Sequence, residues 1–98
     1  MTDLEASALE QKILEGPFKD AQELINSGHA WTLEGSIGRS CMHAINIGAC
    51  MLAPGSRPGY WGNTIPGRFD VKEGSKGSPE FVAERYDEVI EEFSLNQE

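Results

Sequence analysis

The chain has 98 residues, 39% of them hydrophobic, and a formal net charge of −8 at pH 7. This length allows one domain with a thin hydrophobic core. The negative net charge argues against a protein that binds nucleic acids or anionic membrane surfaces. The first residues, MTDLEASALE, lack the basic and apolar regions of a signal peptide, and no apolar run approaches the length of a membrane span.

Charge is distributed unevenly along the chain. Residues 1–34 hold seven acidic and two basic side chains and residues 80–98 hold seven and one, whereas residues 35–79 hold two acidic and five basic ones. The pattern is typical of terminal helices whose acidic faces are solvated. A negative surface directed at a basic partner is the alternative interpretation.

Two helices are predicted at the start of the chain. Thr2 and Glu5 have the spacing of a capping box, in which each side chain satisfies a backbone N–H group of the other, and apolar residues follow at helical spacing up to Gly16-Pro17. A second helix is expected at about residues 18–26, because Gly28 can adopt the left-handed conformation that ends a helix. In the bridge after this helix, Trp31 is predicted to anchor the core.

The longest apolar-rich stretch, residues 33–52, is predicted to be the central and most buried helix. At about 100° per residue its apolar side chains fall within one arc of the helix surface. The residues expected in the core are Leu33, Ile37, Ala44, Ile45 and Met51. Arg39, His43 and Cys50 fall on the opposite side of the helix.

The chain contains two cysteines, Cys41 and Cys50. On one helix they would lie on opposite faces and about 13 Å apart along its axis, which excludes a disulfide between them. Free thiols are therefore expected, as is usual in a cytoplasmic protein.

Residues 54–79 are a different kind of sequence, because ten of the 26 are Gly or Pro. This composition excludes a regular helix. The aromatic side chains of the segment favour an ordered loop packed on the helices over a flexible linker, and Phe69-Asp70-Val71 alternates as a short strand does. Ser78-Pro79 then begins a last, acidic helix at residues 79–95.

These elements predict a mainly α fold with one domain over residues 1–98. It consists of about four helices, with a helical part at 1–53, the Pro/Gly-rich ordered loop at 54–79 and the acidic helix at 79–95. There is room for one short strand pair.

Residues that could carry chemistry are poorly spaced for it. Two cysteines and two histidines could be counted as zinc ligands, but on a helix Cys41 and Cys50 point in opposite directions. His43 and Cys50 share a face yet stand about 10 Å apart, too far for a nucleophilic pair. A helix-turn-helix would offer DNA a single arginine, Arg39, beside an acidic first helix. No metal, no cofactor and no enzymatic reaction are therefore predicted.

The stretch from Gly35 to Ser40 resembles a small-residue turn that enters a helix. Backbone amides there, together with Ser36 and Arg39, could hold an anion. The stretch lacks the lysine and the spacing of a phosphate-binding P-loop. Ser36 and Arg39 are therefore candidates for an anion site only.

The strongest candidate for a partner-binding surface is the aromatic and basic loop. Its residues are Arg57, Tyr60, Trp61, Arg68 and Phe69. Aromatic and arginine side chains anchor many protein interfaces. Closure of the core by Tyr60 and Trp61 is the alternative, and for Trp61 the two interpretations are balanced.

The motifs LINSG, HAW, LEGSIGR, IGACML, YWGN, IPGRF and KGSPEFV lie between residues 24 and 82. They resemble those of small uncharacterised proteins encoded by actinobacterial bacteriophages. The resemblance implies a small product in the cytoplasm of the host cell that modulates a host protein. It implies no activity and no site residues.

Three functions are compatible with this sequence. The first hypothesis is a non-enzymatic protein that binds a host macromolecule, most simply a protein, without direct contact with nucleic acid or membrane. The second is a structural or assembly component of a virion, which would act as a homo-oligomer. The third is an inhibitor whose carboxylates on the terminal helices imitate DNA phosphates.

Overall fold

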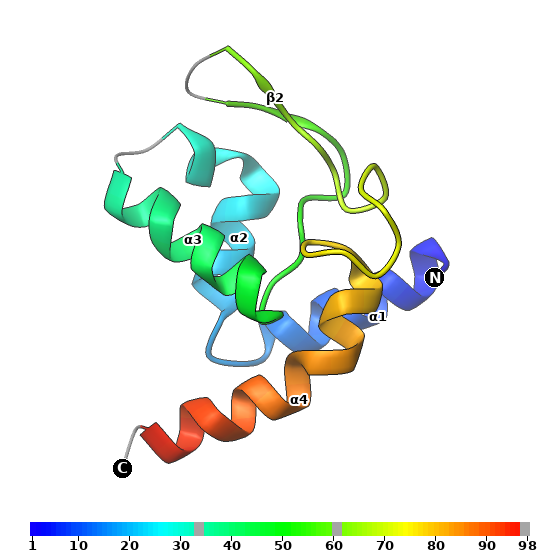
Figure 1. Ribbon diagram of the computed structural model, residues 1–98, viewed down its shortest axis with the longest axis vertical. Coiled ribbons are helices and arrows are strands. Elements are labelled where there is room, and N and C mark those ends of the chain that lie inside the picture. The colour runs from blue at the N-terminus through cyan, green and yellow to red at the C-terminus, as the bar shows by residue number, and fades with distance from the viewer. Residues whose placement is uncertain (33–34, 60–61, 97–98) are drawn as a thin grey trace.

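The computed structural model describes residues 1–32, 35–59 and 62–96, and this part of the chain contains four α-helices, one turn of 3-10 helix and two short strands (Figure 1). In chain order the elements are α1 (Asp3–Leu14), α2 (Lys19–Ser27), η1 (His29–Trp31), α3 (Gly35–Ile47), β1 (Arg57–Pro58), β2 (Thr64–Ile65) and α4 (Pro79–Asn96). The predicted mainly α, single-domain fold is confirmed. The radius of gyration is 12.7 Å, close to the value of about 13 Å expected for a compact domain of this length.

Both helices predicted at the start of the chain form. The Thr2 hydroxyl accepts from the Glu5 N–H group and the Glu5 carboxylate accepts from the Thr2 N–H group, each at 3.1 Å, which completes the capping box of α1. α2 ends at Gly28, whose φ of 87° lies in the left-handed region that glycine enters without steric cost. On the inner faces of the two helices, Ile13 and Ile25 are fully buried.

The central helix is shorter than predicted, because α3 ends at Ile47 rather than at Leu52. Gly48 takes a φ of 88°, and the Cys50 N–H group donates back to the Ala44 carbonyl at 3.2 Å. A left-handed glycine at this position turns the chain out of the helix. Cys50 therefore leaves the helical period and is fully buried, although the sequence placed it on the polar side.

The expected core of this stretch is confirmed in part. Three of the expected residues are buried, namely Ala44, Ile45 and Met51. Ile37 is 40% exposed instead. The first turn of α3 approaches η1 through Gly38, where a Cβ would lie 3.1 Å from the Ala30 carbonyl oxygen, and successive side chains of a helix point about 100° apart, so Ile37 does not share this packed face. Leu33 lies outside the described residues.

An extended segment, residues 49–53, follows α3 and runs through the middle of the molecule, between α2 and α3 on one side and the irregular loops, α1 and the start of α4 on the other (Figure 1). All of its residues are buried. The Leu52 N–H group donates to the Gly77 carbonyl at 3.0 Å, and the Ala53 carbonyl accepts from the Arg68 N–H group at 2.8 Å. The half-buried Trp31 packs against the edge of the same core, as its prediction as a core anchor requires.

The Pro/Gly-rich segment has defined structure in its described parts. β1 and β2 pair antiparallel, with Arg57 opposite Ile65. The predicted strand at Phe69-Asp70-Val71 is a turn, in which the Asp70 N–H group donates to the Gly67 carbonyl at 3.0 Å and the Asp70 carboxylate accepts from the Gly67 N–H group at 2.9 Å. An aspartate that bonds nearby backbone favours a turn over a strand.

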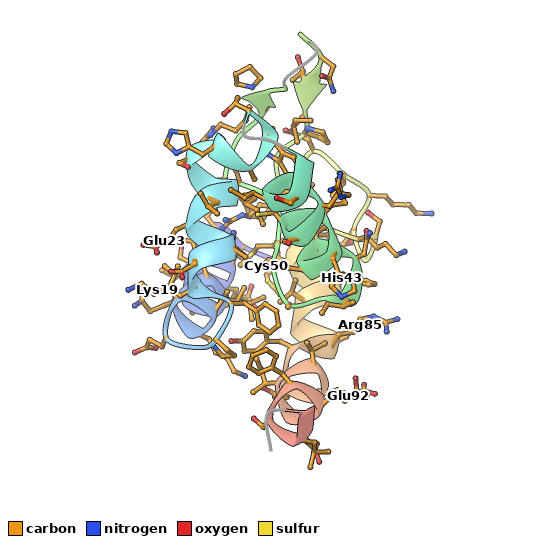
Figure 2. The ribbon with its side chains drawn as sticks, turned by 90° about the vertical axis from the view of Figure 1, so that its left-hand side faces the viewer. Lys19, Glu23, His43, Cys50, Arg85 and Glu92 are labelled. Atoms are coloured by element: carbon orange, nitrogen blue, oxygen red, sulfur yellow. The ribbon has the colours of Figure 1, made fainter. Side chains whose placement is uncertain are left out.

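α4 begins as predicted, because the Ser78 hydroxyl accepts from the Phe81 N–H group at 3.2 Å and a proline follows at the first helical position. The first half of the helix buries Val82 and Tyr86 in the core. The second half projects beyond the other helices in both views (Figures 1 and 2). Its apolar stripe consists of three half-buried residues, Val89, Ile90 and Phe93.

Candidate binding groove

Arg68, predicted to bind a partner, points into the molecule. Its side chain is 3% exposed. Nη2 donates to the Glu10 carboxylate at 2.7 Å and to the Asn26 side-chain oxygen at 3.2 Å, and Nε donates to the Leu52 carbonyl at 2.8 Å. The prediction that Arg68 is exposed on a binding surface is therefore wrong. Its guanidinium instead links the Pro/Gly-rich loop to α1 and α2 through these hydrogen bonds. The five donors of a guanidinium suit it to such a buried set of acceptors.

The other predicted loop residues do not form one surface with Arg68. Arg57 is half-buried, and its Nε donates to the Asn26 carbonyl at 3.0 Å. The two arginines therefore meet at Asn26, inside the molecule. Phe69 remains on the outside, with 45% of its surface exposed. Outside the described residues lie Tyr60 and Trp61.

The buried polar network has a centre that sequence reasoning missed. The Gln22 side chain is fully buried; its amide nitrogen donates to the Met51 carbonyl and its amide oxygen accepts from the Met51 N–H group, both at 2.9 Å. The same nitrogen lies 2.9 Å from the Asn26 side-chain oxygen. One signal was available: Gln22 stands four residues after Phe18 and three before Ile25, and this spacing puts it on the apolar face of its helix.

The candidate anion-binding residues, Ser36 and Arg39, are both exposed near the start of α3. The Arg39 guanidinium folds over Gly35, where an added Cβ would lie 2.7 Å from Nη1. The Ser36 carbonyl accepts from the Ser40 hydroxyl at 2.9 Å. Both candidates line a shallow hollow of about 500 Å³, and their anion-binding role stays a prediction.

A groove of about 640 Å³ lies between the second half of α3 and α4, beside the turn that precedes α2. The residues that line it are Phe18, His43, Ile47, Arg85, Glu88, Val89, Glu92 and Phe93. We call this the α3–α4 groove. The shallow hollow adjoins it, because Phe18 and His43 line both.

The floor of the α3–α4 groove is apolar. The rings of Phe18 and Phe93 pack with their centroids 5.3 Å apart and their planes tilted by 60°, a favourable geometry for two aromatic rings. Ile47 from α3 and Val89 from α4 complete the floor. All four side chains are half-buried, so they leave apolar surface in contact with water.

The rim of the α3–α4 groove is charged and polar. Figure 2 shows His43 from α3, then Arg85 and Glu92 from α4, following one another along one edge of the molecule. The Arg85 guanidinium carbon lies 4.6 Å from the centroid of the Phe81 ring, which holds the cation one turn toward the start of α4. Glu88 and Glu92 are exposed beyond it, so the distal end of the rim is negative.

Cys50 lies in the interior (Figure 2), where its thiol approaches the Phe18 carbonyl at 3.7 Å. Burial raises its pKa from 9.0 to about 12, with a smaller contribution from Cys41, and burial also raises the pKa of Cys41. Both are free thiols, as predicted, although Cys50 is not on the helix. Reactive cysteines need a lowered pKa and access to solvent, so neither thiol is suited to act as a nucleophile.

The described ranges contain no group of three His, Cys, Asp or Glu side chains placed to hold a metal ion. Within the same residues, no helix is long and apolar enough to cross a membrane. Comparisons with protein-family models, with curated proteins and with solved structures find no match for this chain. A function is therefore proposed from the side chains that line the α3–α4 groove.

Proposed function

We propose that the chain is a non-enzymatic binding protein that engages a protein partner through the α3–α4 groove. The observation that carries this proposal is the composition of the groove, a floor of four half-buried apolar side chains inside a charged rim. Protein-recognition surfaces combine an apolar centre with a polar rim in this way. A catalytic site would instead need a reactive group beside an acid or base, and the nearby Cys50 thiol is buried.

The proposed setting is the cytoplasm of a bacterial host cell, and the proposed partner is a host protein. The proposal of this setting rests on two points. One is the resemblance of the sequence motifs to those of actinobacterial phage proteins, which stays a prediction. The other is that both cysteines are free thiols, as is usual in a reducing compartment.

The proposal is tested by capture from a host lysate with the immobilised protein and with a Val89→Asp variant. Val89 lies on the groove floor and is half-buried, at the edge of the buried core against which it packs, so the variant places a carboxylate on partly exposed apolar surface. Loss of a captured protein by at least about tenfold is expected, since an interface anchor contributes about 2 kcal/mol or more. Circular dichroism verifies that the variant is folded.

Leu4→Asp is the matched control, because Leu4 is 82% exposed on α1 and the change in charge is the same. Retained capture by this control is expected. A second comparison uses Phe69→Ala on the Pro/Gly-rich loop. Capture that is lost with Phe69→Ala but kept with Val89→Asp would move the binding site to the loop and overturn the groove as the site.

A further inference from the structure

We infer that the occupant of the α3–α4 groove is an amphipathic helix of a partner protein whose polar face is basic. The inference rests on the proposed function and specifies the chemistry of the partner. Length, exposed apolar surface and charge each contribute to it.

The groove has the length that a docked helix needs. The residues of α4 that line it run from Arg85 to Phe93, a distance of about 12 Å along the helix axis. An amphipathic helix presents anchors at positions i, i+3 or i+4, and i+7, which span about the same two turns. The half-buried floor offers apolar side chains from two helices, Ile47 from α3 and Val89 from α4.

The chain covers this face of α4 incompletely. The distal half of α4 projects beyond the other helices in both views (Figures 1 and 2), where Phe93 reaches the rest of the molecule at the Phe18 ring, 5.3 Å away. The stripe through Val89 and Phe93 stays half-buried. A second helix laid along it would complete the burial of an apolar stripe that has a partner on one side only.

The charges at the distal end select a basic partner. Glu88 and Glu92 border the groove and are exposed, and neither has an ion pair or a side-chain hydrogen bond among the described residues. The last turn of α4 carries no basic residue, so the partial negative charge of the helix terminus adds to theirs. Arg85 is held away from this end by its contact with the Phe81 ring, at 4.6 Å.

The same charges disfavour other occupants. A second copy would bring α4, with six acidic side chains and one arginine among its residues, against a surface of like sign, and each chain carries a net charge of −8. Like charges at an interface suppress association. Anionic membranes and nucleic acids are disfavoured for the same reason.

The test uses two fluorescent helical peptides of about 18 residues with leucine on one face. The polar face is lysine in one peptide and glutamate in the other. Fluorescence anisotropy should show that the Leu/Lys peptide binds the protein, more weakly as salt is raised, and that the Leu/Glu peptide does not. The double variant Glu88→Lys with Glu92→Lys should weaken binding of the Leu/Lys peptide by at least about tenfold.

The matched control is Glu84→Lys with Glu91→Lys, on the same helix and with the same change in net charge. Both residues are exposed and neither lines the groove, so the affinity should change by less than about threefold, through screened long-range charge alone. Thermal melting verifies that all variants are folded.

Four outcomes would overturn the inference. If both double variants weaken binding of the Leu/Lys peptide equally, the peptide is attracted by the net charge of the protein alone. Equal binding of both peptides would mean a groove that does not select charge. Binding of the protein to phosphatidylglycerol vesicles but not to the Leu/Lys peptide would mean a membrane surface. Capture of a host protein could be lost in Val89→Asp and yet be unchanged in the Glu88→Lys, Glu92→Lys variant. This result would overturn the inference of a basic helix but leave the proposed function standing.

Discussion

At the scale of single residues, the molecule depends on polar side chains that replace missing backbone partners. Residue 51 lies in an extended segment with no neighbouring strand in the described structure, so a sheet cannot satisfy its N–H and carbonyl groups. The Gln22 amide supplies both hydrogen bonds, each at 2.9 Å. Buried backbone groups need such partners, and Arg68 does the same for the Leu52 carbonyl at 2.8 Å.

Replacing Gln22 by Met keeps the side-chain volume but leaves the Met51 N–H and carbonyl groups unsatisfied. Each costs about 1–3 kcal/mol, so we expect the free energy of unfolding to fall by about 2–6 kcal/mol in urea titrations. Gln11→Met, at an exposed position of α1, should change it by less than about 0.5 kcal/mol. Equal unfolding midpoints for the two variants would contradict the role given to Gln22.

Stability should fall at alkaline pH because of the buried thiol of Cys50. Burial raises its pKa from 9.0 to about 12, so above pH 9 the unfolded chain releases a proton that the folded chain keeps. Folding then weakens as pH rises, by about 1.4 kcal/mol for each pH unit in that window, and does not change through this group at lower pH.

The measurement is urea unfolding under reducing conditions at pH 8, 9 and 10. In Cys50→Ala the decline should be shallower, although not absent, because burial also raises the pKa of Cys41 and of Tyr86. An alkaline decline that is as steep in Cys50→Ala as in the parent protein would show that the Cys50 thiol is not its cause.

At the scale of elements, the end of α3 directs the path of the chain into the core. Gly48 takes a φ of 88°, and an added Cβ there would lie 2.7 Å from the Cβ of Arg85 on α4. The glycine thus serves the turn and the packing of two helices at once. It also sends residues 49–53 into the core as an extended segment.

Gly48→Ala should therefore cost more than the conformation alone explains. Gly74 is the matched control, since its φ is 85° and nothing lies within 4 Å of an added Cβ. Gly74→Ala should lower the free energy of unfolding by about 1–2 kcal/mol for the left-handed conformation, and Gly48→Ala by at least about 1 kcal/mol more, because of overpacking against Arg85. Thermal and urea unfolding would reveal the difference, and equal losses would argue against tight packing of α3 on α4 at this point.

At the scale of the whole molecule, the α3–α4 groove exists only in the assembled fold. Its floor combines Phe18 from the turn before α2, Ile47 from α3, and Val89 and Phe93 from α4. The groove is therefore lost when the helices no longer pack together, as in the unfolded chain. Its carboxylates are part of the surplus that gives the chain a net charge of −8.

This surplus is expected to keep the free protein monomeric. Sedimentation equilibrium at low salt should give one species with the mass of the chain, 10.7 kDa, because like-charged surfaces repel most strongly when screening is weak. A species of twice this mass that dissociates in Val89→Asp would instead place a second copy in the groove. A larger closed assembly would favour the virion component.

The sequence by itself determined the features that depend on neighbouring residues. The capping box of α1, the stop at Gly28 and the start of α4 at Ser78 each need only a few consecutive residues, and the helical periodicity needs only the chain's own order. The mainly α fold followed from these signals. Such local preferences act in the same way whatever the rest of the chain does.

Only the tertiary structure decided the features that depend on distant partners. Arg68 looks like a surface arginine until Glu10, 58 positions away along the chain, is brought to it. In the sequence, Gln22 is a polar residue that interrupts an apolar stripe. In the folded chain Met51 lies beside it and provides its hydrogen-bond partner. The groove has the same origin, because its apolar floor is partly exposed through the way in which α4 leaves the core. Burial is a property of the assembled molecule, since the free energy of burying a polar group depends on the acceptors and donors that packing places around it.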